Sequence, residues 1–328
     1  MWYGPLMMEH DAKVLQRPMP PEETEYYSWQ KGGTHKFFYM NYENPLEMTV
    51  PFVGGFEIVK LWDEHRDAAE MASRVFYGKP VVCESYEQVS DDVDLVFLAD
   101  CNYDGSDHLT LARPGLEKGV ATYVDKPFAD TVAHANEMIA LARSHKAPLF
   151  SLSILRAEPA VARFRSRLAE VGRPAFATIQ GAGFAPAGLV HTISTAQALF
   201  GTGIRDVRVM ESGEQIAVHL DWGKRPDRPP QGVMINTNVG RRRFTVLCIS
   251  AYGNRDDIHA TFLGDLIYAD GTAEIIRMIA SMVETREVPP LMDEVLESIA
   301  AIQAAQESRR TGYSVPVSKF LSNTTGDK

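Results

Sequence analysis

Cysteine is scarce in this chain of 328 residues, which contains only Cys83, Cys101 and Cys248. Three widely spaced cysteines do not form a disulfide framework, so the sequence is typical of a protein from a reducing compartment. No apolar run approaches the roughly 20 residues that a membrane-spanning helix needs. The first residues also lack the charged and apolar segments of a signal peptide. These absences predict a cytoplasmic protein with no membrane partner.

Basic residues are too few and too scattered for a nucleic-acid-binding surface. The chain has 33 Lys and Arg against 43 Asp and Glu, for a net charge of −10 at pH 7. Its one basic cluster, Arg241–Arg243, follows Gly240 and is interpreted as a solvated hairpin turn. We therefore exclude nucleic acid as the main partner. With 45% apolar residues, the chain can fill two cores, which predicts two domains.

Residues 36–153 predict a Rossmann-type domain with a doubly wound parallel sheet. Strand candidates alternate with helical segments such as Asp67–Phe76, which indicates βαβ units. In such a sheet the carboxyl ends of the strands gather at one edge, where open α/β proteins bind ligands. The expected strands are Lys36–Met40, Phe56–Trp62, Pro80–Cys83, Val93–Ala99 and Ala121–Val124, followed by a last strand before residue 153.

Residues 154–328 predict an α+β domain with a mostly antiparallel open sheet, because strand candidates follow one another with few helices between them. Two helices are expected, Ala273–Glu284 and Met292–Arg310. Residues 1–35 form an N-terminal extension, rich enough in aromatics that we expect it to pack on the body or on a neighbouring subunit. The expected strands are Ala175–Ala182, Val207–Met210, Ile216–Trp222, Gly232–Thr237, Phe244–Ser250 and Ile258–Leu263.

Four segments, in this order, resemble the Gfo/Idh/MocA oxidoreductase family, the group of glucose–fructose oxidoreductase and inositol dehydrogenase. Asp125-Lys126-Pro127 is similar to the family's Glu-Lys-Pro, and Ser153–Pro159 is similar to its Arg-x-x-Pro segment. Gly188–His191 resembles its active-site histidine segment, and Ala304–Gly312 resembles its terminal helix. The resemblance spans residues 36–316.

This resemblance implies an NAD(P)-dependent oxidoreductase that transfers a hydride between nicotinamide and a hydroxyl or carbonyl carbon of a sugar, polyol or related small molecule. It implies that Lys126 and His191 are catalytic and handle the hydroxyl proton. It also implies a homodimer or homotetramer that forms through the C-terminal sheet. The expected cofactor contacts are Asn41, Asn44, Asp63, Asp100, Cys101, Asn102, Asp125 and Lys126.

Further assignments concern the substrate and the choice of dinucleotide. Asp63 ends the second strand, where a carboxylate accepts hydrogen bonds from ribose hydroxyls and repels a 2′-phosphate, so we expect NAD rather than NADP. Arg66 nearby weakens that expectation. Arg156 and His191 are expected at the substrate, although Arg156 could equally form an interdomain salt bridge. The polar loop from Asp100 to His108 matches no metal-binding spacing, and we expect no metal site.

Two departures from the family pattern favour an alternative. Met40–Leu46, where the glycine-rich phosphate loop belongs, contains no glycine, and glycines there let the backbone approach a pyrophosphate closely. Ala187 stands where the family has an aspartate, four residues before His191. The alternative is a non-redox descendant of the fold with a decayed dinucleotide site, acting as a ligand-binding protein or a cofactor-free lyase or hydrolase.

Overall fold

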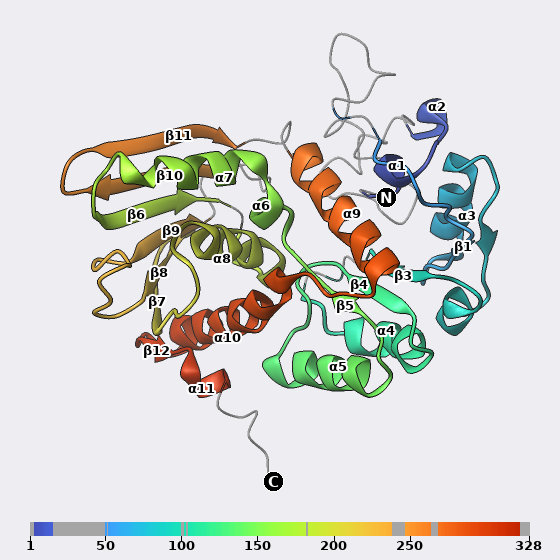
Figure 1. Ribbon diagram of the computed structural model, residues 1–328. Coiled ribbons are helices and arrows are strands. Elements are labelled where there is room, and N and C mark those ends of the chain that lie inside the picture. The colour runs from blue at the N-terminus through green and yellow to red at the C-terminus, as the bar shows by residue number, and fades with distance from the viewer. Residues whose placement is uncertain are drawn as a thin grey trace.

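The computed structural model describes residues 3–15, 50, 52–99, 102, 104–181, 183–237, 247–263 and 268–321. Its two halves lie side by side, the N-terminal half around parallel strands and the C-terminal half around a larger sheet (Figure 1). Several sequence predictions lie outside the described residues: the strand Lys36–Met40, the loop with Asn41 and Asn44, and the pair Asp100 and Cys101.

The N-terminal half is built from parallel strands, as predicted. A two-stranded sheet pairs β1 (Lys60–Leu61) with β2 (Val81–Val82), and a three-stranded sheet contains β3 (Leu95–Leu98), β4 (Ala121–Val124) and β5 (Leu149–Phe150). The strand predicted at Phe56–Trp62 is much shorter, since only Lys60 and Leu61 pair with β2. The helical elements of this half are α3 (Arg66–Val75), the 3₁₀ helix η4 (Tyr86–Ser90), α4 (His108–Glu117) and α5 (Val132–Ser144).

The C-terminal half is a seven-stranded sheet in the order β11-β10-β6-β9-β8-β7-β12, antiparallel except for the β6–β9 pair. Alternate residues of its central strands, such as Val218 in β8 and Ile235 in β9, are buried beneath helices that cover one face of the sheet. The strands are β6 (Pro174–Gln180), β7 (Asp206–Ser212), β8 (Gln215–Asp221), β9 (Val233–Thr237), β10 (Leu247–Gly253), β11 (Asp257–Leu263) and β12 (Val315–Pro316).

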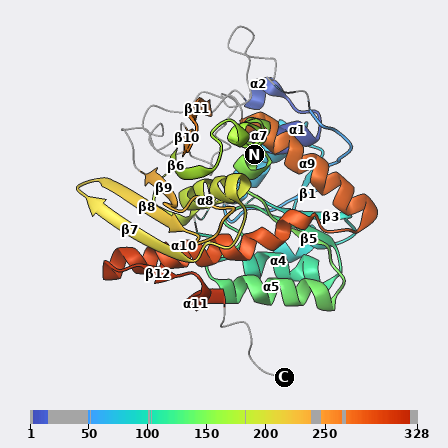
Figure 2. The same cartoon turned by 60° about the vertical axis from the view of Figure 1, so that its left-hand side comes forward.

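The covering helices α8 (Pro186–Phe200) and α10 (Val295–Thr311) run beneath this sheet (Figure 2). Sequence analysis predicted α10 but missed α8. The reason is that α8 has almost no polar face: its residues 189, 190 and 192–200 are all buried. Its polar residues, among them Thr192, Ser194 and Gln197, are buried together with its apolar ones, so the sequence shows no amphipathic period that would reveal the helix. None of the helices in the described ranges combines the length and apolarity that a membrane span requires.

The N-terminal arm, residues 3–15, packs on the body of the protein. Its helices are α1 (Gly4–Met7) and α2 (Ala12–Leu15). Tyr3, Leu6 and Met7 are buried in the main core. The Leu6 carbonyl accepts a hydrogen bond from Val53 N at 2.6 Å, and Asp11 N donates to Val75 O at 2.7 Å. These bonds fix the arm between α3 and α9 (Tyr268–Thr285), where Figure 1 shows α1.

A buried carboxylate joins two helices near the junction of the halves. Glu158 follows α6 (Ile154–Ala157), precedes α7 (Pro159–Ser166) and is 1% exposed. It accepts hydrogen bonds from Ala160 N in α7 and Gly271 N in α9, both at 3.1 Å. Burial is the main cause that raises its pKa from 4.5 to about 7, and the nearby charge of Asp270 adds to the rise. Ionisation of Glu158 is therefore unfavourable in the folded state.

The raised pKa of Glu158 predicts a pH-dependent stability. Protonated Glu158 stabilises the fold fully below pH 4.5, and this contribution is lost as pH rises through about 7, because the folded pKa lies above the unfolded one. The shift corresponds to about 3 kcal/mol. Glu158→Gln should flatten this part of the stability profile in urea unfolding between pH 4 and 8. Glu287→Gln, at an exposed carboxylate, is the control; parallel profiles for wild type and Glu158→Gln would contradict the assignment.

Candidate active site

The parallel sheet delivers three loops to one edge. Leu98 at the end of β3 is paired with Val124 at the end of β4, and Tyr123 is paired with Phe150 at the end of β5. The chain therefore leaves all three strands at the same level. The loops that follow carry Asn102, the pair Asp125-Lys126, and the run Ser151–Ser153. This edge is the one at which sequence analysis placed the ligand.

Lys126 presents its amine at this edge. Its side chain is partly exposed, and the peptide bond between it and Pro127 is cis. Within the described ranges, its Nζ makes no hydrogen bond and no ion pair. It lines a cavity of about 20 Å³ at the junction of the two halves, together with Ser151, Ser153 and Arg156. That volume holds roughly one water molecule, so a larger molecule must meet Lys126 at the open edge.

His191 lies within α8 and is held by a serine from the other half. Its Nδ1 is 2.8 Å from the Oγ of Ser153, which is 3% exposed. Its Nε2 makes no hydrogen bond to any residue that the structure describes. Burial lowers the pKa of His191 well below 6.5, and the positive charge of Lys126 lowers it further. His191 is therefore neutral at physiological pH and lies close enough to Lys126 to feel its charge.

Asp125 is supported by the N-terminal arm. The Tyr3 hydroxyl donates to Asp125 Oδ1 at 3.3 Å and lies 2.9 Å from the Tyr123 hydroxyl. Burial raises the pKa of Asp125, an effect opposed chiefly by the charge of Lys126. Tyr3 also packs against Phe97, with 4.9 Å between ring centroids. Nothing in the sequence ties Tyr3 to a site residue 122 positions away, so sequence analysis missed this support.

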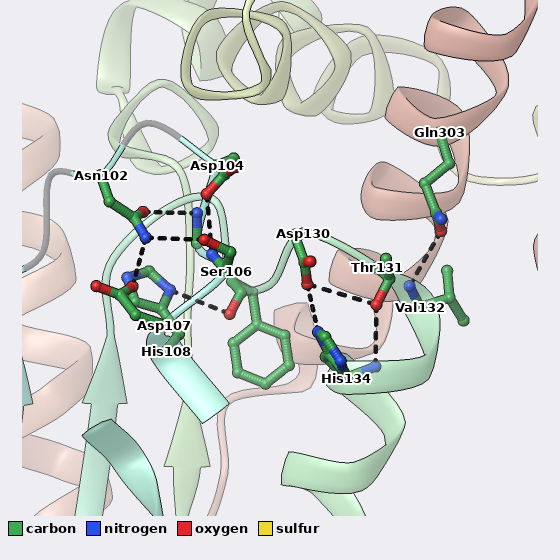
Figure 3. A network of polar contacts seen from close by, with 12 residues as sticks. Asn102, Asp104, Ser106, Asp107, His108, Asp130, Thr131, Val132, His134 and Gln303 are labelled. Atoms are coloured by element: carbon green, nitrogen blue, oxygen red, sulfur yellow. Dashed lines mark hydrogen bonds and ion pairs between the residues drawn. The ribbon is translucent and has the colours of Figure 1, made fainter. Parts of the chain in front are cut away.

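Asn102 organises its own loop, as Figure 3 shows. Its Oδ1 accepts from Gly105 N at 2.8 Å, and its Nδ2 donates to Asp107 Oδ1 at 2.7 Å and to Ser106 Oγ at 3.2 Å. Contact between Asn102 and a cofactor stays a prediction. Within the described part of the chain, no three His, Cys, Asp or Glu side chains are placed to hold a metal ion.

The Asn102 loop is pressed against the Asp-Lys-Pro loop. His108, 1% exposed, has its Nδ1 3.2 Å from the Phe128 carbonyl oxygen, a contact drawn in Figure 3. Gly105 has a φ of +75°, and a Cβ added there would lie 2.4 Å from the Pro127 carbonyl oxygen. Only glycine fits both the left-handed backbone and this close approach. Sequence analysis did not single out Gly105.

Asp63 follows the carboxyl end of β1, as Asp125 follows the carboxyl end of β4. Its Oδ1 accepts from His65 N at 2.8 Å, and among the described residues no donor is bound to Oδ2. Burial is the main cause that raises the pKa of Asp63. Arg66, whose positive charge weakened the expectation of NAD over NADP, forms ion pairs with Glu70 at 3.1 Å and with Glu84 at 2.7 Å. These two carboxylates offset the positive charge of Arg66 that would otherwise attract the 2′-phosphate of NADP.

Arg156 forms a two-point ion pair with Glu294, at 2.7 and 2.9 Å. The side chains are 14% and 22% exposed, and the pair joins α6 to the start of α10. Sequence analysis left Arg156 either at the substrate or in an interdomain salt bridge. The structure contains a salt bridge, but it lies within the C-terminal half and does not join the two domains. Contact between Arg156 and substrate stays a prediction.

The close approach at Gly105 generates a prediction. Gly105→Ala should destabilise the protein by more than Gly78→Ala, because both positions have a positive φ but an added Cβ meets nothing within 4 Å at Gly78. The left-handed backbone alone should cost about 1 kcal/mol at each position. Urea unfolding of both variants checks this, and equal losses would show that the loop yields freely at Pro127.

Comparison with known proteins adds sequence and structural relatives. Residues 33–152 match the model of the Gfo/Idh/MocA family, described as an oxidoreductase family with an NAD-binding Rossmann fold. No curated protein matches the chain. Matches among solved structures share the fold at low identity. They include a probable dehydrogenase from Thermotoga maritima, with 14% identity, a TM-score of 0.66, and coverage of 80% of this chain and 92% of that one.

Two further solved structures carry more specific names. A putative myo-inositol dehydrogenase from Sinorhizobium meliloti has 16% identity and a TM-score of 0.64, over 80% of this chain and 92% of that one. Scyllo-inositol dehydrogenase from Lactobacillus casei, with bound NAD(H) and scyllo-inositol, has 11% identity and a TM-score of 0.68, with the same coverage. At such identities the likeness shows the fold alone. The match of residues 33–152 relates the N-terminal half of the chain to the Gfo/Idh/MocA oxidoreductase family, and the solved structures show the same fold over 80% of the chain.

Proposed function

We propose that this chain is an NAD-dependent oxidoreductase that moves a hydride between nicotinamide and the oxygen-bearing carbon of a polyol or a related hydroxyl compound. The observation that carries the proposal is that two polar side chains lie near each other at one edge of the sheet. These are the amine of Lys126, unpaired among the described residues, and the imidazole of His191, with its Nε2 unbonded there. A proton carrier beside a neutral ring suits a reaction at a hydroxyl or carbonyl oxygen.

The described residues fit a dinucleotide. Asp63 retains a carboxylate oxygen for a ribose hydroxyl, and the charge of Arg66 is offset by Glu70 and Glu84, which favours NAD over NADP. Asn102, Asp125 and Lys126 lie on neighbouring loops of the same edge and would border the nicotinamide end. Asn41 and Asn44 would hold the phosphates, and Asp100 and Cys101 would border the ring; these four remain predictions. When bound, the nicotinamide supplies or accepts the hydride.

The chain's own residues manage the oxygen. In the reducing direction, the Lys126 ammonium gives a proton to the carbonyl oxygen as the hydride arrives at the carbon, which yields an alcohol. In the oxidising direction, the same amine takes the hydroxyl proton as the hydride leaves, which yields a carbonyl. His191, neutral beside Lys126, makes a second hydrogen bond to that oxygen. Together the two groups hold the oxygen in place and offset the charge that develops on it.

An uncharged substrate suits this site better than an anion. The guanidinium of Arg156 is held at two points by Glu294, so it has little free charge to offer a carboxylate. The cavity beside it, of about 20 Å³, has room for roughly one water molecule, so the hydroxyls of such a substrate would lie at the open edge beside Lys126. The named inositol dehydrogenases among the structural relatives act on compounds of that class.

The role of Lys126 predicts a specific kinetic defect. Lys126→Met should lower kcat by on the order of 100-fold or more, the usual contribution of a positioned proton donor, a larger effect than any change in the Kd for NAD. Lys224→Met, at an exposed lysine of the C-terminal half, should behave as wild type. Turnover by Lys126→Met equal to that of wild type would refute the assignment.

Cofactor preference gives a test that does not depend on the substrate. At a free concentration near 100 Kd, NAD should raise the unfolding free energy by about 2.7 kcal/mol, visible as a rise in melting temperature. NADP should do so only at much higher concentrations. Asp63→Asn should weaken NAD binding, whereas Asp67→Asn, at an exposed position on α3, should not. If neither dinucleotide binds, the non-redox alternative replaces this proposal.

A further inference from the structure

The hydrogen bonds around Ser153 restrict which nitrogen of His191 carries the proton. A serine hydroxyl has one proton to donate and can accept two hydrogen bonds. The Ser153 Oγ accepts one from Leu155 N at 3.3 Å, which caps α6. Its other partner among the described residues is His191 Nδ1, at 2.8 Å. Since Ser153 is 3% exposed, bulk solvent offers no acceptor for its proton, and the acceptor must be a protein atom or a water in the small cavity that Ser153 lines.

One arrangement satisfies both Ser153 Oγ and His191 Nδ1, and leaves only Nε2 without a described partner. If Ser153 donates to Nδ1, its proton is bonded, its oxygen accepts from Leu155 N, and Nδ1 acts as the acceptor. If Nδ1 instead carried the proton, Ser153 would accept twice, and its own proton would have no acceptor among the described residues. An unsatisfied buried donor costs about 1–3 kcal/mol. A neutral imidazole carries one proton, so the first arrangement leaves that proton on Nε2.

We propose that Ser153 is the positioning residue of His191: its hydroxyl fixes Nδ1 as the acceptor, so that His191 meets the substrate oxygen as an Nε2–H donor and not as a base. The part about the substrate rests on the function proposed above. Lys126 is then the group that exchanges the hydroxyl proton. Ser153 takes the place that a carboxylate would fill, because Ala187, one helical turn before His191 in α8, has no group to offer.

A hydroxyl and a carboxylate would set the ring differently. A carboxylate can only accept, so it would hold a proton on Nδ1 and favour a charged ring. A hydroxyl can donate, so it permits an unprotonated Nδ1 and a neutral ring. The positive charge of Lys126 acts in the same direction, since it disfavours a second charge on His191. The Ser153–His191 hydrogen bond and the charge of Lys126 thus both favour a neutral His191 ring.

Nitrogen NMR tests the tautomer without cofactor or substrate. Protein labelled with ¹⁵N-histidine is recorded at pH 8, and the His191 signals are assigned by their loss in His191→Gln. We expect an Nδ1 signal of the unprotonated type and an Nε2 signal of the protonated type. Ser153→Thr, which keeps the hydroxyl, should preserve this pattern, and Ser153→Ala should change it. Ser151→Ala, a matched control at a serine that is 2% exposed and lines the same cavity, should not. A protonated Nδ1 in the wild type overturns the proposal.

Substitution by a carboxylate gives a second readout. Ser153→Asp should move the proton to Nδ1 and shift the His191 titration to higher pH in the same spectra. In turnover assays, Ser153→Ala should lower kcat by on the order of ten-fold, the effect expected from the loss of one hydrogen bond. The change in KM should be smaller, and Ser153→Thr should restore kcat. A His191 titration that does not move in Ser153→Asp, or a Ser153→Thr variant as impaired as Ser153→Ala, also overturns the proposal.

The outcomes separate this inference from the function on which it rests. A protonated Nε2 in a protein that binds no dinucleotide supports the placement of the ring and refutes the oxidoreductase role. A protonated Nδ1 in a protein that turns over NAD leaves the oxidoreductase role intact and refutes the role of Ser153. Thermal unfolding of each variant establishes that α6, whose first turn Ser153 caps, is still folded.

Discussion

Parallel hydrogen bonding between β3, β4 and β5 is the constraint on which the rest of the candidate site depends. Because Leu98 is level with Val124 and Tyr123 is level with Phe150, the chain turns out of the sheet at one edge three times. Asp125 N continues the ladder by donating to Leu98 O at 3.0 Å, which fixes the residue before Lys126. A shift of this register by one residue would move each of the side chains of Asp125 and Lys126 to the other side of the sheet from where it now lies.

Packing of the loops on one another then holds this edge in shape. The Asn102 loop rests on the Asp-Lys-Pro loop through Gly105 and His108, and Tyr3 of the N-terminal arm supports Asp125. From the other half, Gln303 of α10 accepts a hydrogen bond from Val132 N at the start of α5, at 3.0 Å. The three hydrogen bonds among these contacts, made by His108, Tyr3 and Gln303, each satisfy a polar group that is at least partly buried. The site is therefore built jointly by the arm, the parallel sheet and the helices of the C-terminal half.

Charge balance explains how the site differs from the family pattern that it resembles. Asp125 is held by Tyr3, Glu294 is paired with Arg156, and no carboxylate lies at position 187. Lys126 therefore forms no ion pair with a described carboxylate, although its charge acts on the neighbouring Asp125, and His191 stays neutral beside it. A hydroxyl at Ser153 keeps this balance, because it binds the ring without adding a negative charge. In the proposed mechanism, the alanine at position 187 therefore leaves Ser153 as the described residue that orients the ring.

The sequence by itself determined the class of fold and indicated candidate site residues. Short apolar runs such as Val93–Ala99 and Ala121–Val124 became β3 and β4, because a strand covered on both faces needs apolar residues throughout. The resemblance pointed to Lys126 and His191. Helix α8, buried on nearly all sides, escaped notice because it carries no amphipathic period.

Only the tertiary structure decided which partners meet these residues. Ser153 and His191 are 38 positions apart, and Tyr3 and Asp125 are 122 apart. Periodicity records contacts within a helix or strand, whereas contacts between distant segments depend on how whole elements pack. The hydrogen bond at His191 Nδ1 and the support of Asp125 depend on those distant contacts, so no local pattern in the chain encodes them.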